Sequence, residues 1–147
     1  MALILPTNHQ LAKSKELKKE DLYSLSFITL DPQSTTRKVV DQLLSSSGLD
    51  VQRLHIEMEL NSLEAIKNAV QANLGAAFLP VVSIERELLG GSLHRPFIAD
   101  LEVKRELKVI TNPGRYSSRA AEAFIQDVLP LFASSVSPLN KLNNNKN

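Results

Sequence analysis

Residues 53–80 read RLHIEMELNSLEAIKNAVQANLGAAFLP and contain three structural patterns in succession. Residues 53–60 alternate polar and apolar side chains, which is the period of a strand with one polar face. Asn61 can cap a helix because Glu64 follows at capping-box spacing. The apolar residues of this helix fall on one stripe: Leu63, Ile66, Val70 and Leu74. Gly75 is predicted to end the helix, and residues 76–79 form a short buried strand that Pro80 stops.

The same alternation of strands and helices extends towards the amino terminus. Residues 2–5, ALIL, lack a polar face and predict a strand buried on both sides. Residues 27–30 predict a second strand. A helix closed by Gly48 then carries the apolar residues Val39, Val40, Leu43 and Leu44. Helical crossovers of about ten residues are right-handed and favour a parallel sheet.

The carboxyl-terminal third has weaker patterns. Apolar and charged residues alternate over 101–109 and predict one or two strands, which end at a Pro113-Gly114 turn. Ser117 or Ser118 is expected to cap a last helix, which Pro130 would kink or finish. Residues 134–147 contain five asparagines and are expected to be disordered.

Composition excludes several classes of protein. The chain has 147 residues, enough for one core, and its net charge of +1 argues against a nucleic-acid clamp. The absence of cysteine excludes a disulfide scaffold and a thiolate site. No stretch approaches the roughly 18 apolar residues of a membrane span. We therefore expect a soluble, intracellular protein that makes no contact with a membrane.

Two predicted helix starts offer polar groups for a ligand: DPQSTTR at 31–37 and LNSLE at 60–64. Ligands of open α/β sheets bind beyond the carboxyl ends of the strands, and helix N-termini favour anions. The alternative reading is that the hydroxyl and amide side chains there only cap the helices. Three consecutive hydroxyls at 34–36 exceed what one cap requires. Arg37 lies in a first turn, where either Asp41 or a bound anion can offset its charge.

The motifs of the common enzyme classes are missing. His9, His55 and His94 are scattered, which argues against a metal site. The sequence has no dinucleotide fingerprint, phosphate-binding loop or nucleophile elbow. No base can be placed near the hydroxyls. We therefore predict a protein that is not an enzyme and that carries no cofactor.

Three segments together resemble the effector-binding domain of LysR-type transcriptional regulators: LILPTNHQLA (3–12), FITLDPQSTTRKVVDQLL (27–44) and ELNSLEAIKNAVQANLGAAFLP (59–80). The likeness extends from Ala2 to about Phe132 and departs at Asn73, where the family often has glycine. Within the family, QSTTRKVVDQ and IEMELNSLEAIKNAV are most similar to the branch that regulates RuBisCO genes in cyanobacteria and algal plastids.

The resemblance implies an α/β fold with a Rossmann-like parallel or mixed sheet flanked by helices. Such a unit forms one lobe of a two-lobe effector domain similar to periplasmic binding proteins. Residues 1–133 would be the second lobe plus a return helix. The winged helix-turn-helix and the first lobe would then be absent from this chain. A cytoplasmic location follows, or the plastid stroma if the source is an alga.

The resemblance also implies a site and partners. The effector, a small anionic metabolite, would contact Gln33, Ser34, Thr35, Thr36 and Arg37, then Asn61 and Ser62, with Pro80 shaping the wall. Effector lobes of the family assemble into homodimers and tetramers, and DNA would be bound only through the absent amino-terminal domain. Two rival interpretations remain open: half of a two-lobe solute-binding protein, and a small α/β transferase.

Overall fold

The computed structural model describes residues 1–101, 110, 112, 114 and 117–133. Its strands are β1 (Ala2–Pro6), β2 (Ser26–Leu30), β3 (His55–Leu60), β4 (Ala77–Leu79) and β5 (Leu93–His94). Its α-helices are α1 (Thr35–Ser46), α2 (Leu63–Gln71), α3 (Glu85–Leu89), α4 (Arg119–Ala123) and α5 (Leu129–Ala133). Short 3₁₀ turns cover Gln10–Lys13, Lys19–Ser24, Val51–Arg53 and Val81–Ser83.

The strands make a mixed sheet rather than a purely parallel one. β2 and β3 pair in parallel, as the crossover through α1 requires. β1 pairs antiparallel with β4 on one side and with β5 on the other. A parallel bridge between Phe27 and Ala76 brings the two ladders together, with hydrogen bonds from Ile28 N and Ala76 N. The expectation of parallel pairing therefore holds for β2 and β3 but is wrong for β1.

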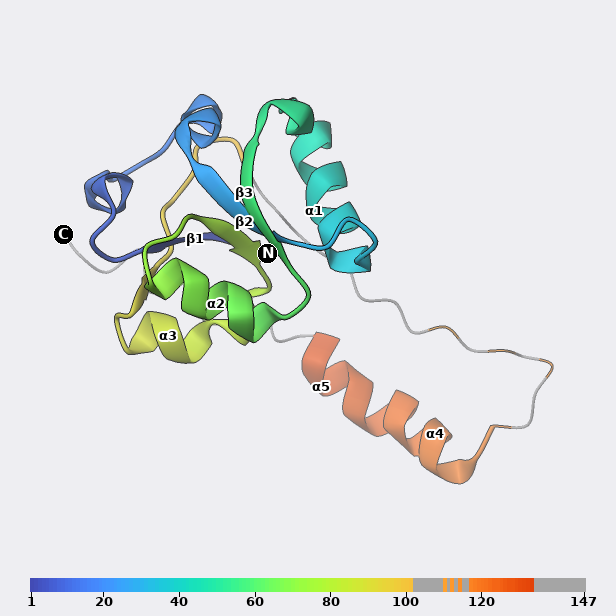
Figure 1. Ribbon diagram of the computed structural model, residues 1–147. Coiled ribbons are helices and arrows are strands. Elements are labelled where there is room, and N and C mark those ends of the chain that lie inside the picture. The colour runs from blue at the N-terminus through green and yellow to red at the C-terminus, as the bar shows by residue number, and fades with distance from the viewer. Residues whose placement is uncertain (102–109, 111, 113, 115–116, 134–147) are drawn as a thin grey trace. The chain divides into compact units, whose positions relative to one another are not determined.

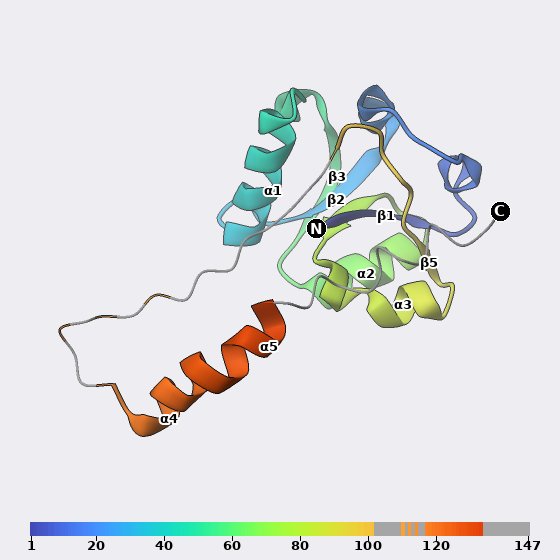
Figure 2. The ribbon, with the colours of Figure 1, turned by 180° about the vertical axis from the view of Figure 1, so that it is seen from behind.

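Helices cover both faces of these strands (Figures 1 and 2). Side chains of β1 alternate between two cores: Leu3 and Leu5 enter the one that contains Val40 and Leu44 of α1. Ala2 and Ile4 enter the other, which contains residues of α2. Every residue of β1 is buried, which confirms the prediction of a strand covered on both faces.

Two boundaries of α2 differ from the prediction. Ser62, not Asn61, is the N-cap, and its hydroxyl accepts a hydrogen bond from Ala65 N at 3.4 Å. The helix ends at Gln71, before Gly75, because Asn73 adopts the left-handed conformation with φ 65°. Leu74 therefore lies beyond the helix and is 50% exposed instead of extending the apolar stripe.

The carboxyl-terminal helical segment forms a separate unit, because the chain divides between Glu106 and Leu107. Ser118 caps α4 by accepting a hydrogen bond from Ala121 N, as predicted. A π-helical stretch, Phe124–Val128, follows and runs directly into α5. Pro130 lies inside α5, so the helix does not finish there. The wider π turn relieves the clash that a proline ring makes with the preceding turn.

Two predictions cannot be compared with the structure. The strands expected over 101–109 and the disorder expected over 134–147 lie almost entirely outside the described residues. Among the residues that the structure does describe, no helix is long and apolar enough to cross a membrane.

Candidate functional site

The parallel pairing of β2 with β3 brings the two polar helix starts together. Leu30 and Leu60 end the two strands in register, and Asp31 N donates a 3.0 Å hydrogen bond to Leu60 O. The parallel bridge from Phe27 to Ala76 orients β4 in the same direction, so Pro80 follows a third strand end. We call these three chain segments, 31–37, 60–64 and 80, the rim. The sequence prediction that both polar corners lie at one edge of the sheet is thus confirmed.

The first corner leaves its hydroxyls unengaged. Ser34 has the extended backbone of an N-cap, but its side chain makes no capping hydrogen bond. The turn before it is closed instead by Asp31, whose Oδ1 accepts from Gln33 N at 2.7 Å. Within the described part of the chain, the side chains of Ser34, Thr35 and Thr36 have no hydrogen-bond partner. The first-turn amides of this 12-residue helix are therefore open to an incoming acceptor.

The second corner is partly satisfied by its own cap. Ser62 is half-buried and its hydroxyl is used by Ala65 N. Asn61 is exposed, and its side chain bonds to none of the described residues. Its amide can therefore supply both a donor and an acceptor to a ligand at the rim.

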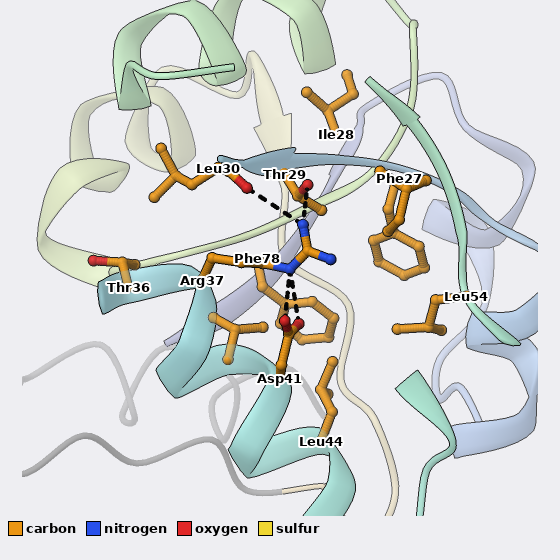
Figure 3. A pocket seen from close by; sticks show the side chains of 12 residues that line it. Phe27, Ile28, Thr29, Leu30, Thr36, Arg37, Asp41, Leu44, Leu54 and Phe78 are labelled. Carbon is orange, nitrogen blue, oxygen red and sulfur yellow. Dashed lines mark hydrogen bonds and ion pairs between the residues drawn. The ribbon is translucent and has the colours of Figure 1, made fainter. Parts of the chain in front are cut away.

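Arg37 is already held by the protein. Its Nε lies 2.9 and 2.8 Å from the two carboxylate oxygens of Asp41 (Figure 3). Its Nη1 donates to Thr29 Oγ1 at 2.6 Å and to Leu30 O at 3.3 Å. The same nitrogen is 3.4 Å from Glu59 Oε1. Of the two alternatives for offsetting the charge of Arg37, the structure shows the pair with Asp41. The side chain of Arg37 extends towards the sheet, while Thr36 points away from the guanidinium (Figure 3).

A small crevice lies between α1 and the sheet, beside Arg37. Its cavity volume is about 30 Å³, well below the roughly 300–1,000 Å³ of typical ligand pockets. Apart from Thr29, Thr36, Arg37 and Asp41, its lining is apolar, and it includes Phe27 and Phe78, whose rings stack at 5.9 Å. The crevice is too small for a metabolite, so the rim is the better candidate for binding one.

A buried lysine, Lys67, joins α2 to α3, and the pattern of apolar residues did not predict it. The side chain of Lys67 is only 8% exposed, and its Nζ lies 2.7 Å from Glu64 and 2.9 Å from Glu87. The hydrogen bonds that Lys67 donates, first to Glu64 and then to Glu87, raise the pKa of Lys67. The hydrogen bond from Lys67 lowers the pKa of Glu87. Lys67 lies four residues after Leu63 and three before Val70, so helical spacing is compatible with the buried face, but only the contact with Glu87 of α3 shows that its charge is held there.

The described residues hold no cluster of three or more histidine, aspartate or glutamate side chains that could bind a metal. His94 is half-buried in β5, and burial lowers its pKa. No base is within hydrogen-bond reach of the rim hydroxyls in the described part of the chain. Among the described residues, the hydroxyls of the rim therefore have no base that would activate them as nucleophiles.

Comparison with known proteins identifies the family. Residues 1–133 match the family described as LysR substrate binding domain. The chain belongs to this family. A relative from Synechocystis named "Probable RuBisCO transcriptional regulator" is 56% identical over 91% of this chain and 39% of its own length. Relatives with the same name from Trichormus variabilis and Porphyra purpurea are 58% and 54% identical over 91% of this chain and 40% and 42% of their lengths.

Solved LysR-family structures share the fold. The Synechocystis CcmR regulatory domain, solved in complex with 2-PG, superposes with a TM-score of 0.73 at 24% identity, covering 92% of this chain and 63% of that one. The effector binding domain of QuiR, in complex with shikimate, superposes with a TM-score of 0.61 at 21% identity, covering 84% of this chain and 56% of that one. This chain therefore has the α/β fold of a LysR effector domain and spans about two fifths of the regulators that it matches.

Proposed function

We propose that this chain is the second lobe and return helix of the effector-sensing domain of a LysR-type transcriptional regulator that controls RuBisCO genes. The observation that carries the proposal is the convergence of two polar helix starts on one rim, with three hydroxyls that have no partner in the described part of the chain. Family membership and relatives named as RuBisCO regulators support it. No observation favours a transferase or a solute-binding protein, and the proposed role is not enzymatic.

The effector in this proposal is a small phosphorylated or carboxylated metabolite. Helix N-termini carry about half a positive charge and present unpaired amides, which suits an anion. The CcmR domain, a structural neighbour, binds 2-PG. Gln33, Ser34, Thr35 and Thr36 would contact the anion, Asn61 and Ser62 would contact it from the second corner, and Pro80 would shape the wall. Arg37 belongs to the same corner, although its guanidinium faces Asp41.

The mechanism in this proposal is a shift of population. The rim would form one wall of a cleft, and a first lobe supplied by the rest of the regulator would form the other. An anion that binds the closed arrangement of the two lobes more tightly than the open one shifts the population towards the closed arrangement. The size of the shift is set by the ratio of the two affinities. The change in lobe orientation would then alter how winged helix-turn-helix domains, also outside this chain, meet DNA.

Partners follow from the same proposal. The regulator would form dimers and tetramers through its effector lobes in the cytoplasm, or in the stroma of an algal plastid. β3 supports such contacts because its outer side faces no other strand among the described residues and its backbone can pair with another chain.

The test is isothermal titration calorimetry on the full-length regulator that contains this chain, with 2-PG, inorganic phosphate and small carboxylates as probes. We expect at least one anion to bind. The double variant Thr35→Val/Thr36→Val should weaken that binding by about tenfold to a hundredfold, the loss for one hydrogen bond to a charged group. Its affinity for operator DNA should stay unchanged.

Thr7→Val is the matched control, because Thr7 is exposed and follows the carboxyl end of β1. The amino end of β1, at Ala2, is the one that pairs with Leu79 next to the rim. Thr7→Val should bind the anion as the wild type does. Absence of binding by every probe, or an equal loss of anion and DNA binding in the double variant, would count against the proposed site.

A further inference from the structure

The rim and the residues directly beside it carry an unfavourable charge for an anion site. Residues 31–41 and 59–64 contain four carboxylates, Asp31, Asp41, Glu59 and Glu64, against two cations, Arg37 and Lys38. Glu64 is paired with Lys67. The remaining carboxylates would repel a phosphate or carboxylate bound at the start of α1 unless a cation compensates them.

Arg37 meets two of these carboxylates at once. Its Nε is held by both oxygens of Asp41, and its Nη1 approaches Glu59, which lies on the neighbouring strand. The side chain of Arg37 is only 13% exposed, against 34% for Asp41 and 45% for Glu59, so water and salt screen the contact with Asp41 less than they screen a fully exposed pair. Thr29 and Leu30 fix the same nitrogen beside the end of β2.

Lys38 cannot replace Arg37 in neutralising Asp41 and Glu59. Lys38 is exposed, and its ammonium has no partner among the described residues. An exposed cation on a flexible stem is hydrated and compensates a fixed carboxylate weakly, whereas the planar guanidinium binds two oxygens in a fixed geometry.

We propose that Arg37 is a positioning residue that keeps the rim receptive to an anion by neutralising Asp41 and Glu59, without touching the anion itself. This inference rests on the proposed function, and it assigns a specific electrostatic task to one residue of that site. Removing the guanidinium exposes the effector to two uncompensated carboxylates, so the affinity for anions falls although every ligand contact remains.

The test uses calorimetry on the full-length regulator with the anion that binds the wild type. Arg37→Gln should weaken binding about tenfold or more at low ionic strength. Because salt screens repulsion between separated charges, the loss should shrink as ionic strength rises. The triple variant Arg37→Gln/Asp41→Asn/Glu59→Gln removes the repelling charges as well and should bind within about threefold of the wild type.

Lys38→Gln is the matched control, since it removes the same charge one residue further along the same helix turn. It should change affinity by less than about twofold. Urea denaturation of each variant reports whether the lobe remains folded. A loss of anion affinity that persists in the triple variant, or that does not depend on salt, would overturn the proposal. It would indicate that Arg37 contacts the anion directly or that the substitution displaces α1. Absence of anion binding by the wild type would instead reject the proposed function.

Discussion

Lys67 illustrates how a single residue can lie on the apolar face of a helix and remain charged. Its four-carbon stem packs among the buried residues of α2, and its ammonium reaches Glu87 of α3 and Glu64 of its own helix. Desolvation opposes the charged form, yet the two hydrogen bonds outweigh it and raise the pKa of Lys67. Removing one partner of such a cluster leaves the other charge without compensation.

We predict that Lys67→Met lowers the free energy of unfolding at pH 7 by about 1–3 kcal/mol. Because Lys67 lowers the pKa of Glu87, the contribution of the pair is present above the ordinary glutamate pKa of about 4.3 and is lost as the pH falls through the lowered value. The difference in free energy of unfolding between the wild type and Lys67→Met should therefore become smaller below about pH 4. At the alkaline end, the contribution should persist until the pH rises through the raised pKa of Lys67, above about 10.4.

Urea denaturation followed by circular dichroism, at pH 7 and at acid pH, checks this prediction. Lys38→Met, at an exposed lysine of α1, should change stability by less than about 0.5 kcal/mol. Equal stability of Lys67→Met and the wild type at pH 7 would show that the ion pairs contribute nothing net.

At the scale of elements, the link from α2 to β4 determines how the two ladders join. Asn73 ends the helix in a left-handed conformation, and Gly75 then lets the chain pass close to β2. A Cβ at position 75 would lie 2.7 Å from Ser26 O, an atom that accepts the hydrogen bond from Ala76 N. Only glycine permits this approach of two backbones.

We predict that Gly75→Ala destabilises the protein by about 2–4 kcal/mol, because either the bridge at Ala76 opens or β2 shifts. Gly48→Ala is the matched control: φ is 85° there, but no heavy atom lies within 4 Å of an added Cβ. Gly48→Ala should lower the free energy of unfolding by only about 1–2 kcal/mol, the cost of placing alanine in a left-handed conformation. Urea denaturation of both variants gives the comparison, and a larger loss in Gly48→Ala would contradict our account of the junction.

At the scale of the whole molecule, the chain consists of two units of different character. Both hydrophobic cores are built from residues of the first unit, Met1–Glu106. In the second unit, Phe124 of the π-helical stretch and Leu131 of α5 are 51% and 70% exposed. By itself, such a helical segment depends on helix propensity, and isolated helices of about 15 residues are marginal in water.

We predict that a chain shortened to residues 1–106 unfolds cooperatively in urea, with a free energy within about 1 kcal/mol of the 147-residue chain. A peptide of residues 107–147 should show little helix by circular dichroism. Loss of cooperative unfolding in the shortened chain would mean that the carboxyl-terminal unit contributes to the core.

The site was predictable in its location but not in its contacts. Parallel strands followed by helices place the residues after Leu30 and Leu60 on one rim, which the alternation of strands and helices already implies. The i to i+4 spacing also offered the pairing of Arg37 with Asp41 as one of two alternatives, and the structure contains this pair. The contacts of Arg37 with Thr29 and Glu59 join a helix to two strands, so no local pattern carries them.

The sequence by itself determined the order of β1, β2, α1, β3, α2 and β4, the buried character of residues 2–5 and the one-sided exposure of β3, because these depend on local periodicity and composition. Only the tertiary structure decided that β1 runs antiparallel between β4 and β5, that Ser62 rather than Asn61 caps α2, and that Lys67 is buried between two helices. Strand direction and the burial of a charge depend on which distant segments meet, and the pairing free energy of those segments is not encoded in any short window of residues.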